Sequence, residues 1–344
     1  MAPLLPTSGS LGGQTLREEK SIRCEKIIFA LTSRDARHIA ALGPAGFNLW
    51  ERGDPIRRIA LFPDPAHRAG GWSFTAWAFS PDGKILAVSD VAGTVGFYET
   101  QGSKLSRRLP VSESPVWAVA YSADGGLLAT TSADHFVRVW DATSNRMMWA
   151  LPGAEVGFMR AAAFSPDGAK LAAVADNANV YVFDVLASKL IRMFDNTLMA
   201  SFGLAFTKDS KHLAVGGASS EISLLGLTTG VVERTFGREQ NVVAGLTLNA
   251  HGDIFAARYR NPLDMTKPAP VILWDAASGK ERLKIDIPDT HFNAIGFNEN
   301  GVTVTSWSDG ALHIWSVPFR RSDWRLGADE SAVAKVVTPR SICR

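Results

Sequence analysis

Cysteine is scarce in this chain of 344 residues, which contains only Cys24 and Cys343. Two cysteines are too few for the disulfide framework of a small secreted domain. Free thiols are therefore the expectation, with a bridge as the alternative if the fold brings the two ends of the chain together.

Long apolar runs and an excess of one charge are also missing. No stretch approaches the 18 apolar residues of a membrane span, and the first 20 residues lack the basic start and apolar core of an export signal. The 36 Lys and Arg residues nearly balance the 34 Asp and Glu residues, whereas nucleic-acid binding usually needs a clustered basic surface. We expect a cytoplasmic protein with no membrane insertion and no nucleic-acid partner.

Motifs of catalytic and metal sites are absent from the sequence. It has no Gly-x-Ser-x-Gly nucleophile turn, no Gly-x-x-x-x-Gly-Lys phosphate loop, and no His or Cys pair at zinc spacing. The seven histidines are scattered, and the recurring Asp residues stand in turns, where turn chemistry accounts for them. The sequence predicts a non-enzymatic protein with no cofactor, no metal and no catalytic residue.

What the chain does have is a repeat. An aromatic residue or Leu ends a strand-like apolar run at intervals of 41 to 49 residues, and turn residues keep a period of 42 or 43. Such a unit cannot bury both faces of its own sheet, so it must stack on its neighbours. The anchors are Trp50, Tyr98, Trp140, Phe183, Leu225, Trp274 and Trp315; the turn markers are Asp82, Asp124, Asp167, Asp209 and His251.

The third repeat shows the internal plan of the unit. Short runs of apolar, branched and aromatic residues, typical of strands, alternate with Asp-Gly and Ser-x-Asp turns. The four predicted strands cover residues 116–121, 127–131, 136–141 and 146–151.

Three phrases of this plan resemble the WD-repeat β-propeller family: Phe-Ser-Pro-Asp-Gly at 79–83, Ser-x-Asp at 132–134, and Val-x-Val-Trp-Asp at 137–141. The resemblance covers roughly residues 25–318. It implies an all-β fold, a single seven-bladed β-propeller of four-stranded antiparallel blades, and a role as a rigid platform for protein partners. The family's Gly-His opening is missing, although Ser132, Asp134 and Trp140 keep part of its buried hydrogen-bond network.

The predicted organisation has three parts. Residues 1–15 form a flexible N-terminal segment, 16–327 form the propeller, and 328–344 form a C-terminal tail. A strand from either 16–24 or 322–327 closes the ring. Residues 318–344, in which six Lys and Arg residues outnumber three carboxylates, are expected to be solvated, with docking to an acidic partner as the alternative.

Equivalent positions of the repeats suggest where a partner binds. The residue four before the end of each inner strand should lie at the channel mouth, and these positions diverge in type. Trp and Arg, two frequent binding hot spots, occupy two of them, and Trp72 and Phe74 extend the same rim. The positions are Ile27, Thr75, Trp117, Arg160, Phe202, Ala244 and Asn293.

Each of these candidates also has a structural alternative. Trp117 and Phe202 could pack between blades, Trp72 and Phe74 could cover the channel, and Arg160 should point to solvent or pair with a carboxylate.

A long connection at 258–268 completes the candidate surface, with Arg258, Tyr259 and Arg260 as its binding residues, since surface loops on a rigid scaffold often carry specificity. The sequence thus predicts a scaffold that binds a protein or peptide across one face. The alternatives are a structural subunit of a larger assembly and a channel-bound small-molecule binder or hydrolase.

Overall fold

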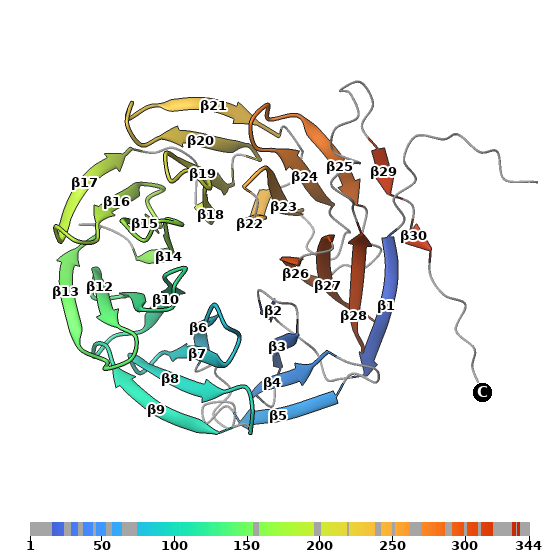
Figure 1. The fold of residues 1–344 in the computed structure, drawn as a ribbon, viewed down its shortest axis with the longest axis horizontal. Helices are drawn as coiled ribbons and strands as arrows, with labels where there is room; N and C mark the ends of the chain where they lie inside the picture. The colour runs from blue at the N-terminus through green and yellow to red at the C-terminus, as the bar shows by residue number, and fades with distance from the viewer. Residues whose placement is uncertain are drawn as a thin grey trace, which may run out of the picture.

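The computed structural model describes residues 16–23, 29–33, 37–43, 46–52, 57–63, 74–102, 104–153, 158–195, 201–218, 220–237, 242–249, 252–261, 270–285, 291–298, 301–308, 311–318, 332–334 and 336–337. The regular elements of this part of the chain are β-strands. Their sheets stand side by side in a closed ring (Figure 1). No helix in the described part is long and apolar enough to cross a membrane.

Five sheets have four antiparallel strands each, and in every one the first strand is nearest the axis and the last is at the perimeter (Figure 1). These are β2 (Phe29–Thr32), β3 (His38–Gly43), β4 (Gly46–Glu51) and β5 (Arg57–Pro63); β6 (Phe74–Phe79), β7 (Ile85–Asp90), β8 (Thr94–Glu99) and β9 (Leu105–Pro110); β10 (Val116–Tyr121), β11 (Leu127–Ser132), β12 (Phe136–Asp141) and β13 (Met147–Pro152); β14 (Met159–Phe164), β15 (Lys170–Ala175), β16 (Val180–Asp184) and β17 (Lys189–Phe194); and β18 (Ser201–Phe206), β19 (His212–Gly217), β20 (Ile222–Gly226) and β21 (Val232–Phe236).

Two further sheets have five strands. The first contains β22 (Val242–Leu248), β23 (Ile254–Arg260), β24 (Val271–Asp275) and β25 (Glu281–Ile285), with β29 (Ala332–Ala334) added parallel to β25. The second contains β26 (His291–Asn298), β27 (Gly301–Ser308) and β28 (Ala311–Pro318), followed by β1 (Leu16–Arg23) and then β30 (Val336–Val337), which is parallel to β1.

The predicted fold class, a seven-bladed propeller of four-stranded antiparallel blades, is therefore wrong as stated. Two sheets are five-stranded and mixed, because short strands from the C-terminal region add to their outer edges. These strands lie outside the repeat and carry none of its landmarks, so the repeat period could not reveal them. What holds is an all-β propeller whose basic unit is four antiparallel strands.

Strand β1 lies beside the last repeat. It pairs antiparallel with β28, from Arg17 opposite Ser316 to Arg23 opposite Ala311. Of the two segments considered for closing the ring, the structure thus places the N-terminal one as the fourth strand of this sheet, and 322–327 lies outside the described residues. Pairing of β28 covers an edge that would otherwise be free to bind another strand.

All seven anchor residues lie at a β-bulge between the third strand of a sheet and its outer neighbour. In the third repeat, for example, the register shifts between Val139 and Trp140, and Met148 has no partner. A bulge bends a strand and increases its twist. Six of the seven anchors are buried, Tyr98 being the half-buried exception, so the repeat period marks both the core and the bend of the outer strand.

The buried network predicted around Trp140 is arranged differently. The indole Nε1 of Trp140 donates to Thr130 Oγ1 at 2.9 Å. Ser132 donates to Asp134, whose carboxylate also pairs with Arg138 at 2.5 Å. The expected connection of Ser132 and Asp134 to Trp140 is therefore wrong, because Thr130 and Arg138 take the partner positions.

Hydrogen bonds also join successive blades at the perimeter. In each case a side chain of an outer strand donates to a backbone carbonyl in the turn before the outer strand of the next sheet. Such bonds fix the angle between neighbouring sheets with groups that would otherwise face water or lie unpaired. The donors and acceptors are Arg107 to Ala142 and Thr143, Trp149 to Val185, Arg192 to Thr228, and Arg234 to Ala277.

Candidate partner-binding site

The predicted rim positions share one backbone feature. Thr75, Trp117, Arg160, Phe202 and Ala244 are each the extra residue of a bulge between the first and second strands of their sheet. Asn293 falls within the corresponding irregularity of β26, and Ile27 lies outside the described residues. A bulged side chain leaves the regular alternation of the strand and is aimed away from the ladder. This geometry explains why residue type can vary here while the fold repeats.

Two of the predicted residues have structural roles. The Thr75 hydroxyl hydrogen-bonds with Ser89 Oγ at 2.9 Å and donates to the Val116 carbonyl of the next sheet. Phe74 packs edge-on against Phe47 of the preceding sheet, with ring centroids 5.8 Å apart. Trp72 lies outside the described residues, as do the side chains of Phe202 and Asn293.

Trp117 and Arg160 come together at the boundary between the third and fourth repeats. The Arg160 guanidinium lies over the Trp117 ring, with Cζ 4.6 Å from its centroid, and 5.6 Å from the centroid of Phe158. Phe158 lies just before β14 and stacks on His135, at 5.9 Å and an interplanar angle of 18°. We refer to Trp117, His135, Phe158, Arg160 and Asp176 as the aromatic–arginine cluster.

Asp176 fixes the guanidinium. Arg160 Nε and Nη2 donate to the two carboxylate oxygens of Asp176 at 2.6 and 3.1 Å. Asp176 is itself positioned by its backbone N–H, which donates to the carbonyl of Phe158 at 2.9 Å. A bidentate pair holds both side chains in one orientation. Of the two alternatives for Arg160, exposure to solvent or pairing with a carboxylate, the structure shows the pair.

The cluster is still accessible to a partner. The side chains of Arg160 and Asp176 are 40% and 36% exposed, and Phe158 is 36% exposed. Trp117 is half-buried and contacts residues of the neighbouring sheet, so it both packs between blades and faces the rim. Its Nε1 is buried and finds no hydrogen-bond partner among the described residues, so a partner reaches the ring of Trp117 rather than this atom.

The three residues predicted to bind from the loop at 258–268 do not lie in a loop. Strand β23 continues to Arg260, so Arg258, Tyr259 and Arg260 belong to a strand and their assignment to the loop is wrong. Tyr259 is 2% exposed and belongs to the core between the fifth and sixth repeats. Arg258 donates through Nη2 to the Ala244 carbonyl at 2.8 Å. The signal is the apolar run at 254–257, which continues into Tyr259 between two arginines, and it outweighs the polar residues that suggested a loop. Residues 262–269 lie outside the described part.

Three members of the cluster were missed in the sequence. His135 was counted only among the scattered histidines, and neither Phe158 nor Asp176 stood out. The positive φ of His135, 68°, is unusual for a residue other than glycine. Asp176 follows the end of β15 where the third repeat has Ala133, and this difference between repeats was a usable signal.

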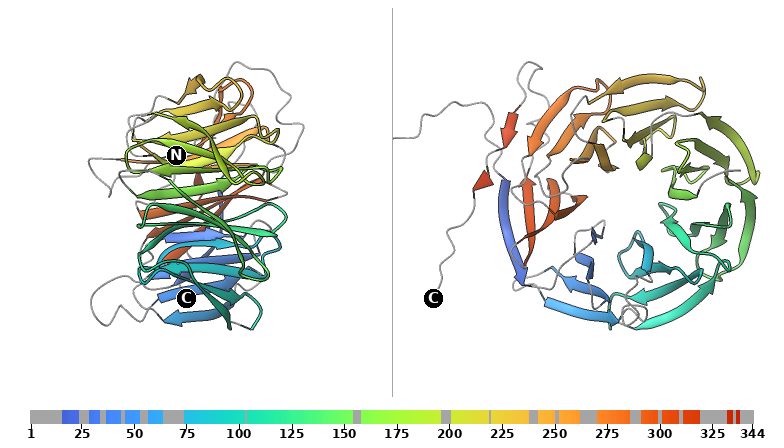
Figure 2. Two further views of the ribbon diagram at one scale, coloured as in Figure 1. Left: turned by 90° about the vertical axis from the view of Figure 1, so that its left-hand side faces the viewer. Right: turned by 180° about the vertical axis from the view of Figure 1, so that it is seen from behind.

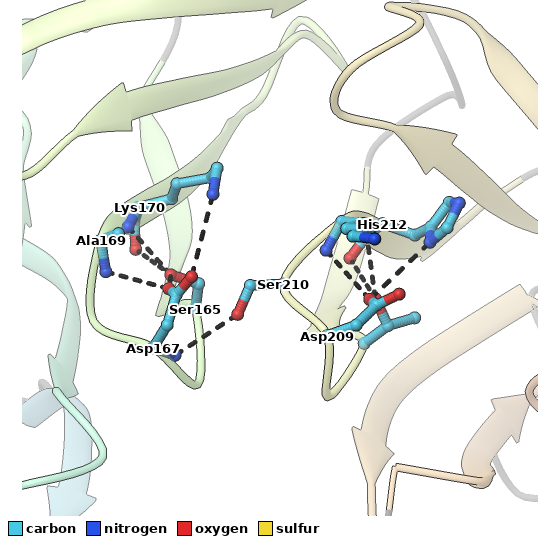
Figure 3. Close-up of polar contacts among 9 residues, drawn as sticks. Ser165, Asp167, Ala169, Lys170, Asp209, Ser210 and His212 are labelled. Carbon is cyan, nitrogen blue, oxygen red and sulfur yellow. Dashed lines mark hydrogen bonds and ion pairs between the residues drawn. The ribbon is translucent and has the colours of Figure 1, made fainter.

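The turns between the first and second strands are uniform, in contrast to the cluster. A Ser or Thr hydroxyl donates to the Asp two residues later in four successive repeats, at 2.5 to 2.7 Å. Figure 3 shows two such neighbouring turns, around Asp167 and Asp209, with Ser210 Oγ accepting from the Asp167 backbone N–H at 3.3 Å. The hydrogen bond from Ser122 holds the pKa of Asp124 below its ordinary value, and that from Ser80 does the same for the pKa of Asp82. No group of three potential metal ligands occurs within the described ranges.

A closed ring of radially arranged antiparallel sheets defines the β-propeller class. Within that class, the family model for the WD domain, G-beta repeat, matches residues 103–141. A WD repeat-containing protein, SL1-17, from Schistosoma mansoni is 31% identical over 114 residues, 33% of this chain and 37% of the relative. A periodic tryptophan protein 2 homolog from Neurospora crassa is 23% identical over 284 residues, 71% of this chain and 30% of the relative. Over the residues matched, the chain is therefore similar to WD-repeat proteins.

A shorter match involves the human U5 small nuclear ribonucleoprotein 40 kDa protein, which is 36% identical over 66 residues, 19% of this chain and 18% of the relative. All three matches span less than two fifths of the relative's length. They therefore concern the repeat and its fold rather than the whole activity of those proteins.

Proposed function

We propose that this chain is a non-enzymatic interaction platform that binds a protein or peptide partner across the rim carrying the aromatic–arginine cluster. The WD-repeat family is generally non-enzymatic and supplies scaffolds, and one relative is by name part of a ribonucleoprotein. The observation that carries the proposal is the Arg160 guanidinium, held by Asp176 over two aromatic rings yet 40% exposed. The cytoplasmic location stays a prediction from the sequence.

The chemistry of the cluster suits peptide recognition. Large aromatic faces contribute contact area, and a guanidinium already oriented by a carboxylate loses little freedom when a partner binds. The partner would thus present an apolar or aromatic side chain to the exposed Phe158 ring and the Arg160 guanidinium.

The test is capture of partners from the native host by the full chain, followed by affinity measurement on the co-purified protein. Arg160→Ala and Phe158→Ala should each weaken binding by about 2 kcal/mol, or about thirtyfold. Arg108→Ala is the matched control, because Arg108 is exposed on β9 at the perimeter. If all three variants and the unaltered chain bound the partner with equal affinity, the rim would not be the binding site.

A further inference from the structure

The perimeter of the ring is made of outer strands whose backbone edges face outward (Figures 1 and 2). The chain covers two of these edges itself, placing β29 beside β25 and β30 beside β1, both in parallel. Each added strand is a short extended segment of Ala and Val residues. An outer edge of this propeller can therefore accept a strand of small apolar residues.

Among the open outer strands whose side chains the structure describes, β17 exposes the most large apolar residues. Leu190, Ile191 and Met193 are 46%, 39% and 46% exposed, and Leu186 in the preceding turn is 95% exposed. Proteins usually protect such edges with charged residues, Pro or short length. Strand β17 contains two cations, Lys189 and Arg192, but neither Pro nor a carboxylate, whereas β9 and β13 each end in Pro and β21 contains a Glu.

The shape of the perimeter favours a peptide over a second copy of the chain. The outline is convex (Figure 1), so two rings meeting side by side would touch over little more than one strand from each. A stable protein interface needs about 800 Å² per partner. An extended segment needs only to follow one strand, whose backbone supplies the hydrogen bonds.

The charge of β17 indicates which kind of peptide fits this edge. The only ionisable side chains in β17 are Lys189 and Arg192, which are exposed and half-buried. Oppositely charged cross-strand pairs stabilise a sheet, and like charges directly opposite destabilise it. A segment carrying a carboxylate among its apolar residues therefore fits this edge better than a basic one.

We propose that the outer edge of β17 is a second binding site, which takes an extended apolar segment with an acidic residue from a partner protein by strand addition. The site is distinct from the aromatic–arginine cluster and does not depend on it. Backbone pairing supplies affinity, and Leu190, Met193 and the two cations select the sequence.

Hydrogen–deuterium exchange of the full chain tests this with two synthetic peptides. One has the sequence of residues 331–338, and the other has the same sequence with Lys335→Glu. At saturating peptide, amides 189–194 should exchange more slowly. The acidic peptide should bind about twofold to fivefold more tightly than the basic one at low salt.

The double variant Leu190→Lys/Met193→Lys should lose this protection. Val231→Lys/Val232→Lys, at positions of similar exposure on or beside β21, should retain it. Circular dichroism and thermal melting establish that both variants are folded before binding is compared. Protection confined to 281–285 or 16–23, where the chain's own strands sit, would overturn the proposal, as would equal protection in both variants or none in the unaltered chain.

Discussion

The turns that follow the first strands and the bulges within those strands differ in what they keep constant from repeat to repeat. The turns between first and second strands repeat one polar device, a Ser or Thr hydroxyl donating to Asp, in four successive repeats. The inner-strand bulges repeat one backbone shape but carry Thr, Trp, Arg, Phe and Ala at equivalent positions. Where the same residue recurs, the fold needs it. Where only the backbone recurs, the side chain can vary: Thr75 bonds to the next sheet, whereas Arg160 is exposed at the rim.

Substitution of a repeated anchor should have the largest effect on stability. Trp140→Ala removes a 6% exposed ring and the hydrogen bond from its Nε1 to Thr130. We expect a loss of about 3–5 kcal/mol in the free energy of unfolding, measured by urea titration. Trp117→Ala, the bulge counterpart, should cost clearly less, because Trp117 is only half-buried. Equal losses of unfolding free energy for the two variants would show that the bulge residue Trp117 is as important to the fold as the anchor Trp140.

A smaller effect on stability is expected from the hydrogen bonds that join one repeat to the next. Trp149→Phe keeps a ring against Phe183, whose centroid lies 6.0 Å away, but removes the hydrogen bond from Nε1 to the Val185 carbonyl. The free energy of unfolding should fall by about 1–2 kcal/mol. Thermal melting measures it, with Met148→Leu as a control at an exposed neighbour. No change in melting temperature would show that water replaces the lost donor.

The sequence predicted much of this architecture and less of the site. Anchor spacing located the third strands, because each anchor is a core residue fixed at a bulge. It could not locate β29 and β30, whose pairing depends on edges formed by distant parts of the chain. Comparison of repeats found Trp117 and Arg160, yet Phe158 and His135 join them only through contacts between neighbouring sheets. Tyr259 was misplaced because its polar neighbours concealed the length of β23.

The uniform turns should respond to pH. Ser122→Ala removes the hydroxyl that donates to Asp124 at 2.5 Å and accepts from the Leu127 N–H at 2.9 Å. At pH 7 the loss should be about 1 kcal/mol, and the pKa of Asp124 should rise towards its ordinary value.

The sign of the pH effect follows from the lowered pKa of Asp124. A carboxyl group with a lowered pKa in the folded state stabilises the fold above its unfolded pKa of about 4, and this contribution is lost as the pH falls through the folded value. The difference between Ser122→Ala and the unaltered chain should therefore shrink below about pH 4. Urea titrations at pH 7 and pH 3 measure it, and a difference that grows in acid would contradict the assignment.

The smallest effect on stability should come from the cluster itself. The pair between Arg160 and Asp176 is substantially exposed, and exposed ion pairs contribute about 0–1 kcal/mol. Arg160→Ala and Asp176→Ala should thus lower the free energy of unfolding by about 0.5 kcal/mol or less, even though Arg160→Ala should weaken the proposed partner binding about thirtyfold. Losses of several kcal/mol would mean that Arg160 stabilises the fold as the repeated turns do. The distinction between structural turns and binding residues at the bulges would then fail at Arg160 itself.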